Sequence, residues 1–224
     1  MPADSAASAA RTASAARATD AATTPGPRAA STRERILDAA TARFYEQGIR
    51  ATSADRVIDD VGITKVTFYR HFRTKSDLVV AYLQRQAEGE REWMRTARSD
   101  GDPVASLHAL AAGIGAASCR PGFRGCPFIN AAAEFADADD PVRAAVEEHR
   151  RWTAEEFAAI ATEADVDDPE AVAGQLQLLR DGAMVNGYLS DPAAIAGALD
   201  AAFTAVLARA SGHDSARSAN TQEK

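Results

Sequence analysis

The chain has 224 residues, of which 46% are hydrophobic and 25% charged, and its formal net charge is −7. This composition is ordinary for a soluble protein with one or two domains, and no stretch predicts a membrane-spanning helix. The N-terminus lacks the apolar segment of a secretory signal and resembles an organelle transit peptide only superficially, so we expect a cytoplasmic protein.

The charge is distributed unevenly along the chain. Residues 31–76, the head, carry nine Lys or Arg against six Asp or Glu, whereas residues 77–224 carry 13 against 24. A basic head on an acidic body directs a protein toward phosphate groups and keeps the body away from them. The pattern therefore favours a nucleic-acid partner for the head.

Residues 1–30 are of low complexity and contain Pro25 and Pro27, so we expect a disordered arm. Arginines in such an arm can enter a minor groove, and Arg28 is the candidate nearest to the head. A solvated tail is the alternative interpretation. We expect residues 212–224 to form a second disordered tail.

The first predicted helix of the head begins at a capping box formed by Ser31 and Glu34 and stops at Gly48. Its apolar residues recur at helical spacing, which predicts one buried face. This stripe consists of Ile36, Leu37, Ala40 and Phe44.

Two shorter helices follow. Thr52 is expected to cap the first of them, which ends at Gly62, and Thr64 is expected to cap the second at once. Phe68 and Phe72 lie four residues apart on the inner face of the second helix. Two helices this short need a partner, so residues 31–76 predict one three-helix domain with a helix-turn-helix.

At these residues the chain resembles the tetracycline-repressor (TetR) family of bacterial transcription regulators. The resemblance covers roughly residues 31–80, and it departs at Val66, a position that bears on base preference. It implies an all-α fold, DNA binding by a homodimer, repression as the commonest activity and release by a small molecule. The matching residues are Gly48, Ile49, Thr52, Gly62, then Thr67-Phe68-Tyr69-Arg70-His71-Phe72, and Lys75.

A helix that enters the major groove presents its first residues to base edges and leaves its flanks to bind phosphate. Lys donates to guanine, and Val and the Thr methyl contact thymine. Taken singly, each candidate could be a surface or core-edge residue; together they predict DNA contact. The candidates are Thr52, Thr64, Lys65, Val66, Thr67, Tyr69, His71 and Lys75.

One head reads too few bases to be selective, because each mismatch costs only about 1–3 kcal/mol. We therefore expect a two-fold symmetric dimer on a pseudo-palindromic site, with half-sites about one or two helical turns apart.

The body is predicted to be helical throughout. A long helix spans about 77–98, and a short apolar one runs from Pro127 to Phe135. Asp-Pro pairs mark helix starts, because Asp caps free N–H groups and Pro gives up a donor that no helix would use. These pairs are Asp102-Pro103, Asp140-Pro141, Asp168-Pro169 and Asp191-Pro192. The count is about nine helices with no convincing strand, an all-α chain with a body at residues 77–211.

The last two helices are apolar on more than one face. One predicted stripe is Val172, Leu176, Leu179 and Ala183, with Leu178 and Val185 outside it. The other is Ile195, Leu199, Ala202 and Val206, with Phe203 and Leu207 beside it. One face suits the core and the second suits another subunit, although a wholly internal pair is the alternative. The family resemblance implies a four-helix dimer interface.

The resemblance also implies a small-molecule effector in the body. Aromatic side chains with a few polar groups are typical of a ligand lining, and an ordinary core is the alternative. The candidates are Trp93, Phe123, Phe128, Asn130, Trp152, Met184 and Tyr188, with Phe135 and Asn186 as further members.

Cys119 and Cys126 are the only cysteines and flank a loop with two arginines. They suggest a redox-responsive regulator as an alternative to the ligand, with ordinary packing as the simpler interpretation. Cys-to-Ser variants that still release DNA on oxidation would exclude it.

We predict no metal site and no cofactor, because His108 and His149 stand alone and the acidic run from Glu134 to Asp140 suits a solvated linker. We also find no catalytic motif and expect no enzyme, so an all-α enzyme or binding protein is the remaining rival.

Overall fold

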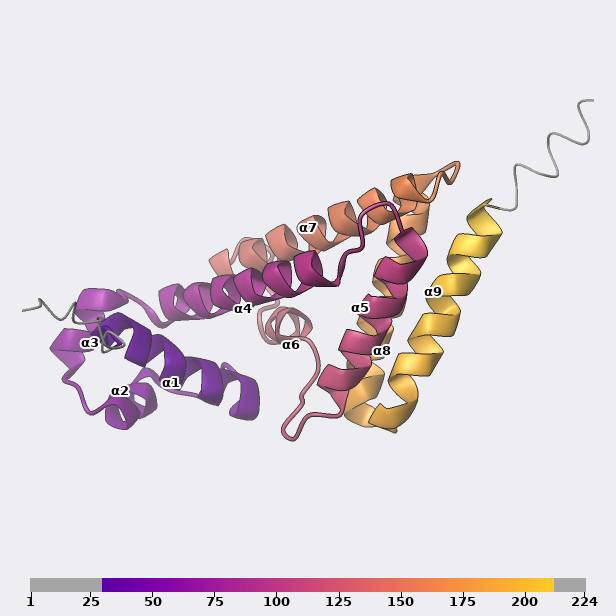
Figure 1. Cartoon of the computed structure of the whole chain (residues 1–224). Helices are drawn as coiled ribbons and strands as arrows, with labels where there is room; N and C mark the ends of the chain where they lie inside the picture. Colours follow the sequence, from indigo (N-terminus) through magenta and orange to yellow (C-terminus); the bar gives the residue numbers. More distant parts are fainter. Residues whose placement is uncertain (1–29, 212–224) are drawn as a thin grey trace, which may run out of the picture. The chain divides into compact units, whose positions relative to one another are not determined.

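The computed structural model describes residues 30–211, and within this range the fold is all-α, as predicted (Figure 1). The predicted arm with Arg28 and the predicted tail at 212–224 lie outside the described residues. The helices are α1 (Thr32–Gln47), α2 (Ala54–Val61), α3 (Lys65–His71), α4 (Lys75–Ala97), α5 (Pro103–Ser118), α6 (Pro127–Glu134), α7 (Pro141–Glu163), α8 (Pro169–Leu189) and α9 (Ile195–Ser211), with a 3-10 turn, η1, at Pro192–Ala194.

Local sequence signals place most helix ends correctly. The capping box of α1 is confirmed, because Glu34 N donates to Ser31 Oγ at 3.2 Å and Ser31 N donates to Glu34 Oε2 at 2.7 Å. The Asp-Pro pairs at 102, 140 and 168 begin α5, α7 and α8, and the pair at 191 begins η1, which leads into α9. These ends form locally, so a short stretch of sequence is enough to find them.

Helix α4 begins two residues before the predicted start at Asp77. Its cap is Thr74, which accepts from Asp77 N at 3.0 Å, while the carboxylate of Asp77 accepts from Thr74 N at 2.9 Å. This second capping box places Lys75 in the first turn of the helix.

A hydrophobic cluster runs from α1, α2 and α3 through the first half of α4 into α6 and α7. Phe44 of α1 packs edge-on against Tyr82 of α4, with ring centroids 5.6 Å apart. A second cluster joins the end of α4 to α5, α7, α8 and α9; in Figure 1, α5, α8 and α9 lie at this end of α4, and α7 runs alongside it. Because the first cluster spans both sides of residues 76 and 77, the boundary expected there stays a prediction.

Helices α8 and α9 each bury one stripe and expose another. Leu178 and Val185 of α8 are 71% and 41% exposed, so the described pair is not wholly internal. On α9 the buried residues are Ile195, Leu199, Phe203 and Leu207. Ala202 and Val206, predicted for this stripe, lie half-buried at its edge, because the stripe advances in steps of four.

By length and composition alone, Pro192–Ser211 could cross a membrane, which the sequence prediction did not anticipate. Its buried stripe packs in the cluster shared with α5 and α8. The apolar character of α9 therefore has a use inside the fold and is weak evidence for a bilayer.

A buried ionic cluster joins α4, α7 and α8. Arg180 Nη2 lies 2.6 Å from Glu90 Oε1, and Arg180 Nη1 lies 3.0 Å from Asp181 Oδ1. His149 Nε2 lies 3.2 Å from Glu90 Oε2, although the atoms are not aligned for a hydrogen bond. The imidazole stacks on Phe128 with centroids 3.5 Å apart. The sequence prediction had no partner for either histidine. In the fold, His149 lies against Glu90 and Phe128, and His108 pairs with Asp200.

This cluster makes stability depend on pH. Burial by itself raises the pKa of Glu90, but the interactions with Arg180 and His149 outweigh burial and hold the pKa at about 2, against an ordinary value of 4.5. Because the folded-state pKa is the lower one, the cluster stabilises the fold above pH 4.5, and this contribution is lost as the pH falls toward 2.

We expect Glu90→Ala to destabilise the protein by about 3–5 kcal/mol near neutral pH, because it leaves the buried Arg180 without its main partner. The loss of stability between pH 4.5 and 2 should also become shallower. Denaturant unfolding across this pH range measures both effects. Glu88→Ala, an exposed position on the same helix, serves as the control, and equal losses from the two variants would contradict the assignment.

Candidate nucleic-acid interface

Helices α2 and α3 are joined by a tight turn. Gly62 ends α2 in the left-handed conformation with φ 69°, where residues with a side chain are strained. Thr64 then accepts from Thr67 N at 3.2 Å and begins α3, as predicted. Phe68 and Phe72 are 0% and 2% exposed and fix α3 against the head. The helix-turn-helix therefore rests on two local caps and two buried rings.

The predicted role of Thr52 as the cap of α2 is wrong. The cap of α2 is Ser53, whose Oγ accepts from Arg56 N at 3.3 Å. Thr52 is fully buried, and its hydroxyl donates to Gly48 O at 2.9 Å. The chain turns inward at Thr52 and α2 begins after Ser53, so the Thr52 hydroxyl closes the loop after α1 instead of capping α2.

The first turns of α3 form an exposed surface. Val66 is 72% exposed and Tyr69 is 48% exposed, although both are large hydrophobic side chains. Thr64 and Lys65 are also exposed, and Thr67 is half-buried with its hydroxyl 3.0 Å from that of Thr64. The structure thus brings five of the predicted residues onto one short helix start.

Lys65 does not extend freely into solvent. Its Nζ lies 2.9 Å from Asp55 Oδ1 of α2, and the hydrogen bond to this carboxylate raises the pKa of Lys65. The amine is therefore charged and held beside the start of α3, where a base or phosphate has to compete with Asp55 for it.

His71 and Lys75 lie farther from this surface. Both are half-buried, His71 as the last residue of α3 and Lys75 as the first residue of α4. Burial lowers the pKa of Lys75, while the charge of Glu134 acts in the opposite direction. The two residues sit at the edge of the exposed face rather than at its centre.

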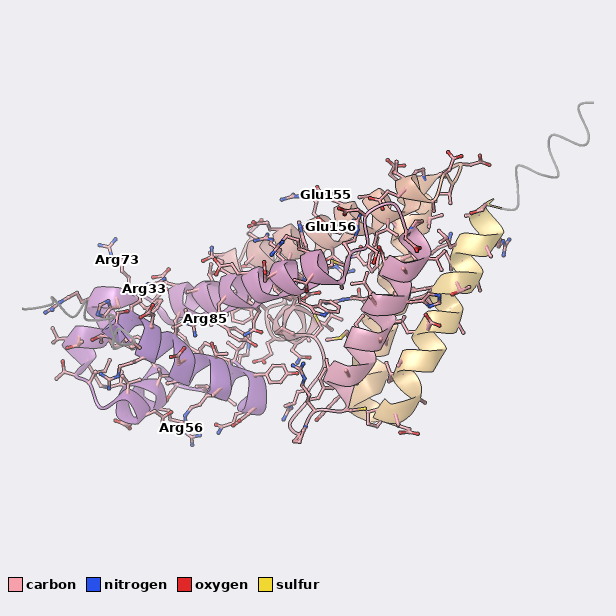
Figure 2. The ribbon with its side chains drawn as sticks, in the orientation of Figure 1. Arg33, Arg56, Arg73, Arg85, Glu155 and Glu156 are labelled. Carbon is pink, nitrogen blue, oxygen red and sulfur yellow. The ribbon has the colours of Figure 1, made fainter. Side chains whose placement is uncertain are left out.

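Sequence reasoning missed several arginines of the head. Arg33, Arg56 and Arg73 are exposed, and Figure 2 labels them on α1, α2 and the segment between α3 and α4. Arg33 lies over the ring of Phe72 at 5.0 Å, so the core of α3 fixes its position. The positive count of the head signalled such residues, but their placement depends on how the helices pack.

The residues predicted to line a ligand site do not meet in one place. Phe123 and Met184 line a recess of about 440 Å³ beside α1 and α5. Asn130 and Tyr188 line a different cavity of about 250 Å³ between α1 and α6. Trp93 and Trp152 are half-buried, and Phe128 is buried. Of the two further members, Phe135 is half-buried beneath Arg50, and Asn186 faces the groove between α8 and α9.

The two cysteines differ in environment. Cys119 is exposed at the end of α5, whereas Cys126 is buried at the start of α6, and both are free. The guanidinium Nη1 of Arg180 lies 3.4 Å from Cys126 Sγ. The redox alternative stays a prediction.

The sequence suggested that Glu134 belongs to a solvated linker, but the structure places it elsewhere. It is the last residue of α6, and its carboxylate accepts from Ile49 N at 2.9 Å and from Arg50 N at 2.6 Å. These amides lie in the loop between α1 and α2, 85 and 84 residues away in sequence. The body thereby holds the backbone of the head directly in front of the helix-turn-helix.

Family models match both parts of the chain. Residues 36–82 match a model described as bacterial regulatory proteins, tetR family. Residues 103–221 match a model described as tetracyclin repressor-like, C-terminal domain.

Among curated proteins, the HTH-type transcriptional regulator AcrR of Shigella flexneri is 36% identical over 81 residues, which cover 35% of this chain and 38% of that protein. The HTH-type transcriptional activator FasR of Mycolicibacterium smegmatis is 35% identical over 68 residues, 29% of this chain and 31% of that protein. The chain thus matches about a third of the length of these relatives.

Solved structures match over most of the chain. A TetR-family transcriptional regulator from Streptomyces coelicolor superposes with a TM-score of 0.76 at 37% identity, covering 80% of this chain and 96% of that one. The reduced form of Escherichia coli NemR has the same fold, with a TM-score of 0.68 at 19% identity and coverage of 78% and 94%.

Ser53 caps α2, and its contribution to stability can be measured. Ser53→Ala should lower the free energy of unfolding by about 1 kcal/mol, because it removes the acceptor for the first turn of α2. Thermal or denaturant unfolding measures this loss. Ser76→Ala, a half-buried serine that caps no helix, is the matched control and should change stability little. No loss at Ser53, or the same loss at Ser76, would show that Ser53 is not the cap.

Proposed function

The chain belongs to the tetR family of bacterial regulatory proteins and is a DNA-binding transcriptional regulator, not an enzyme, and we propose that it is a repressor. It acts in the cytoplasm, binds a palindromic operator as a homodimer and is released by a small-molecule effector. The observation that carries this proposal is the exposed start of α3, where a charged Lys65 stands beside an exposed Val66.

The exposed residues divide by the contacts that they suit. Lys65 suits guanine O6 or N7, and Val66 and Thr67 suit a thymine methyl. Thr64, Tyr69, His71 and Lys75 suit the phosphate backbone, with Arg33, Arg56 and Arg73 as additional cations. Their summed positive charge gives the binding a strong dependence on salt.

We propose the domain limits that the sequence predicts. The arm is residues 1–30, the DNA-binding head 31–76, the regulatory and dimerisation body 77–211 and the tail 212–224.

A redox response through Cys119 and Cys126 is the alternative trigger, and the contact between Cys126 and Arg180 is the observation that favours it. Repression is proposed, although FasR, a relative of the head, is named an activator.

The two outer faces of α8 and α9 support the dimer. Leu178 and Leu189 are 71% and 70% exposed. Between the helices runs a groove of about 440 Å³, lined in part by the small residues Gly182, Ala198 and Ala202. Small residues let helices approach closely, and an exposed apolar patch of this kind is typical of a subunit interface. Two copies of this pair form a four-helix interface.

Lys65→Ala should weaken binding to the selected operator by about 1–3 kcal/mol, or roughly 5- to 150-fold, and relax base preference at one position. Selection from a random DNA pool identifies the operator, and a salt titration then compares the variants. Arg151→Ala, an exposed arginine of α7, should leave affinity unchanged. If folded wild-type protein enriches no sequence, or Lys65→Ala binds as tightly as wild type, operator recognition by α3 is refuted.

Leu178→Arg should convert the dimer into a monomer, because two arginines would face each other in an apolar interface. Sedimentation velocity measures the mass, and operator binding should weaken in parallel because each half-site is then bound separately. Ala144→Arg places the same charge at an exposed position on α7 and should leave a dimer. A dimeric Leu178→Arg protein would place the interface elsewhere.

A further inference from the structure

A cavity of about 250 Å³ lies where the head meets the body, between the end of α1, the middle of α4, α6 and the last turn of α8. We call it the seam cavity. It is more enclosed than the larger recess beside Phe123 and Met184. Its walls combine aromatic rings with a few polar groups, namely Phe44, Tyr45, Tyr82, Tyr188, Asn130 and Glu134.

Tyr82 gives this cavity a specific chemical feature. The residue is 2% exposed, and its hydroxyl forms no hydrogen bond with any residue that the structure describes. Burial raises the pKa of Tyr82, and Tyr45, Cys126 and Glu134 raise it further. Tyr82 lines the cavity together with Tyr45 and Glu134. The Tyr82 hydroxyl is not among the fully buried polar atoms that lack a partner, so it keeps some accessible surface, and as part of the cavity lining it is available to donate to a ligand.

The other polar groups are already partly occupied. Each carboxylate oxygen of Glu134 accepts one backbone N–H, and Asn130 Nδ2 donates to Arg124 O at 2.9 Å. Arg124 lies over the ring of Tyr188 at 5.4 Å, so a cation is already present at the rim. The carboxylate disfavours an anionic ligand, and the guanidinium disfavours a second cation.

We propose that the seam cavity binds the effector, and that the effector is a small neutral aromatic molecule with one hydroxyl or carbonyl oxygen. The proposal rests on the function proposed above. The volume is below the range of about 300–1,000 Å³ for drug-sized ligands, and it therefore suits a single substituted ring. The ring packs among the aromatic walls, and its oxygen bonds to Tyr82.

The walls of the seam cavity are also the contacts that hold the head. Tyr45 Oη accepts from Arg124 N at 2.9 Å and donates to Gly125 O at 3.0 Å. On the other side, Glu134 holds the amides of Ile49 and Arg50. A ligand that separates these walls displaces the loop in front of α2, and with it α3. Occupancy is thereby coupled to the orientation of the helix-turn-helix.

The test uses the full-length protein and 4-fluorophenol as the probe, with fluorobenzene as the hydroxyl-free control. Binding is followed by ¹⁹F NMR in the absence of DNA, so it does not depend on operator recognition. We expect 4-fluorophenol to bind more tightly than fluorobenzene. Tyr82→Phe, which keeps the ring, should weaken 4-fluorophenol at least tenfold and leave fluorobenzene unchanged.

Two filling variants locate the site. Ala133→Trp should block the probe, because Ala133 lines the seam cavity, whereas Ala42→Trp, in the recess beside Phe123, should not. Should Ala133→Trp fail to fold, Tyr82→Phe and Ala42→Trp still decide the question. Equal binding of the two probes, insensitivity to Tyr82→Phe, or a block by Ala42→Trp overturns the site.

A third measurement tests whether binding of the probe changes the affinity for the operator. Saturating 4-fluorophenol should weaken wild-type affinity for the selected operator at least fivefold, and should have little effect on Tyr82→Phe. If wild type binds both the operator and the probe but the two bind independently, the cavity is not the effector site. If wild type binds the probe but no operator, the DNA-binding proposal fails while the ligand site stands.

Discussion

One carboxylate of the body holds the main chain of the DNA-binding head. After α1 the chain turns at Gly48, with φ 96°, and the amides of Ile49 and Arg50 belong to no helix. Backbone N–H groups in a packed protein need acceptors, and Glu134 supplies both from the end of α6. The carboxylate is also 3.3 Å from where a Cβ at residue 48 would lie, so a side chain there would strain both the turn and the contact. Glu134 thus binds main-chain atoms of the head, so this contact does not depend on which side chains of the head contact DNA.

Helix α4 links this contact to the rest of the body. Its first half carries Tyr82, which packs on Phe44 of the head, and its second half carries Glu90, which pairs with Arg180 of α8. A buried ion pair resists separation because either charge left alone is strongly unfavourable. A shift of α8 that keeps this pair therefore moves α4, and α4 carries the ring that packs on the head.

The outer faces of α8 and α9 differ from their inner faces in the residues that they carry. Inside, both helices bury large residues such as Leu176 and Phe203, which fix them to the core. Outside, α8 exposes Leu178 and Leu189, and small residues line the groove between the two helices, a surface that water stabilises poorly. Dimerisation would place two heads at a fixed separation, so the same contacts that hold one head would also set the spacing between half-sites.

The sequence alone determined the all-α fold, most helix limits and the exposed start of α3, because caps, turns and apolar periodicity are local features. It placed Ser31, Thr64 and the Asp-Pro pairs correctly, and it identified Phe68 and Phe72 as the inner face of α3. Only the tertiary structure decided what depends on distant partners. Whether Thr52 or Ser53 caps α2 depends on which side chain the core takes in, and the two are adjacent and chemically alike. The roles of Glu134, His149 and Cys126 come from contacts across many tens of residues, which no local pattern encodes. The division of the expected ligand lining between two cavities has the same cause, since a cavity is what remains after every helix has packed.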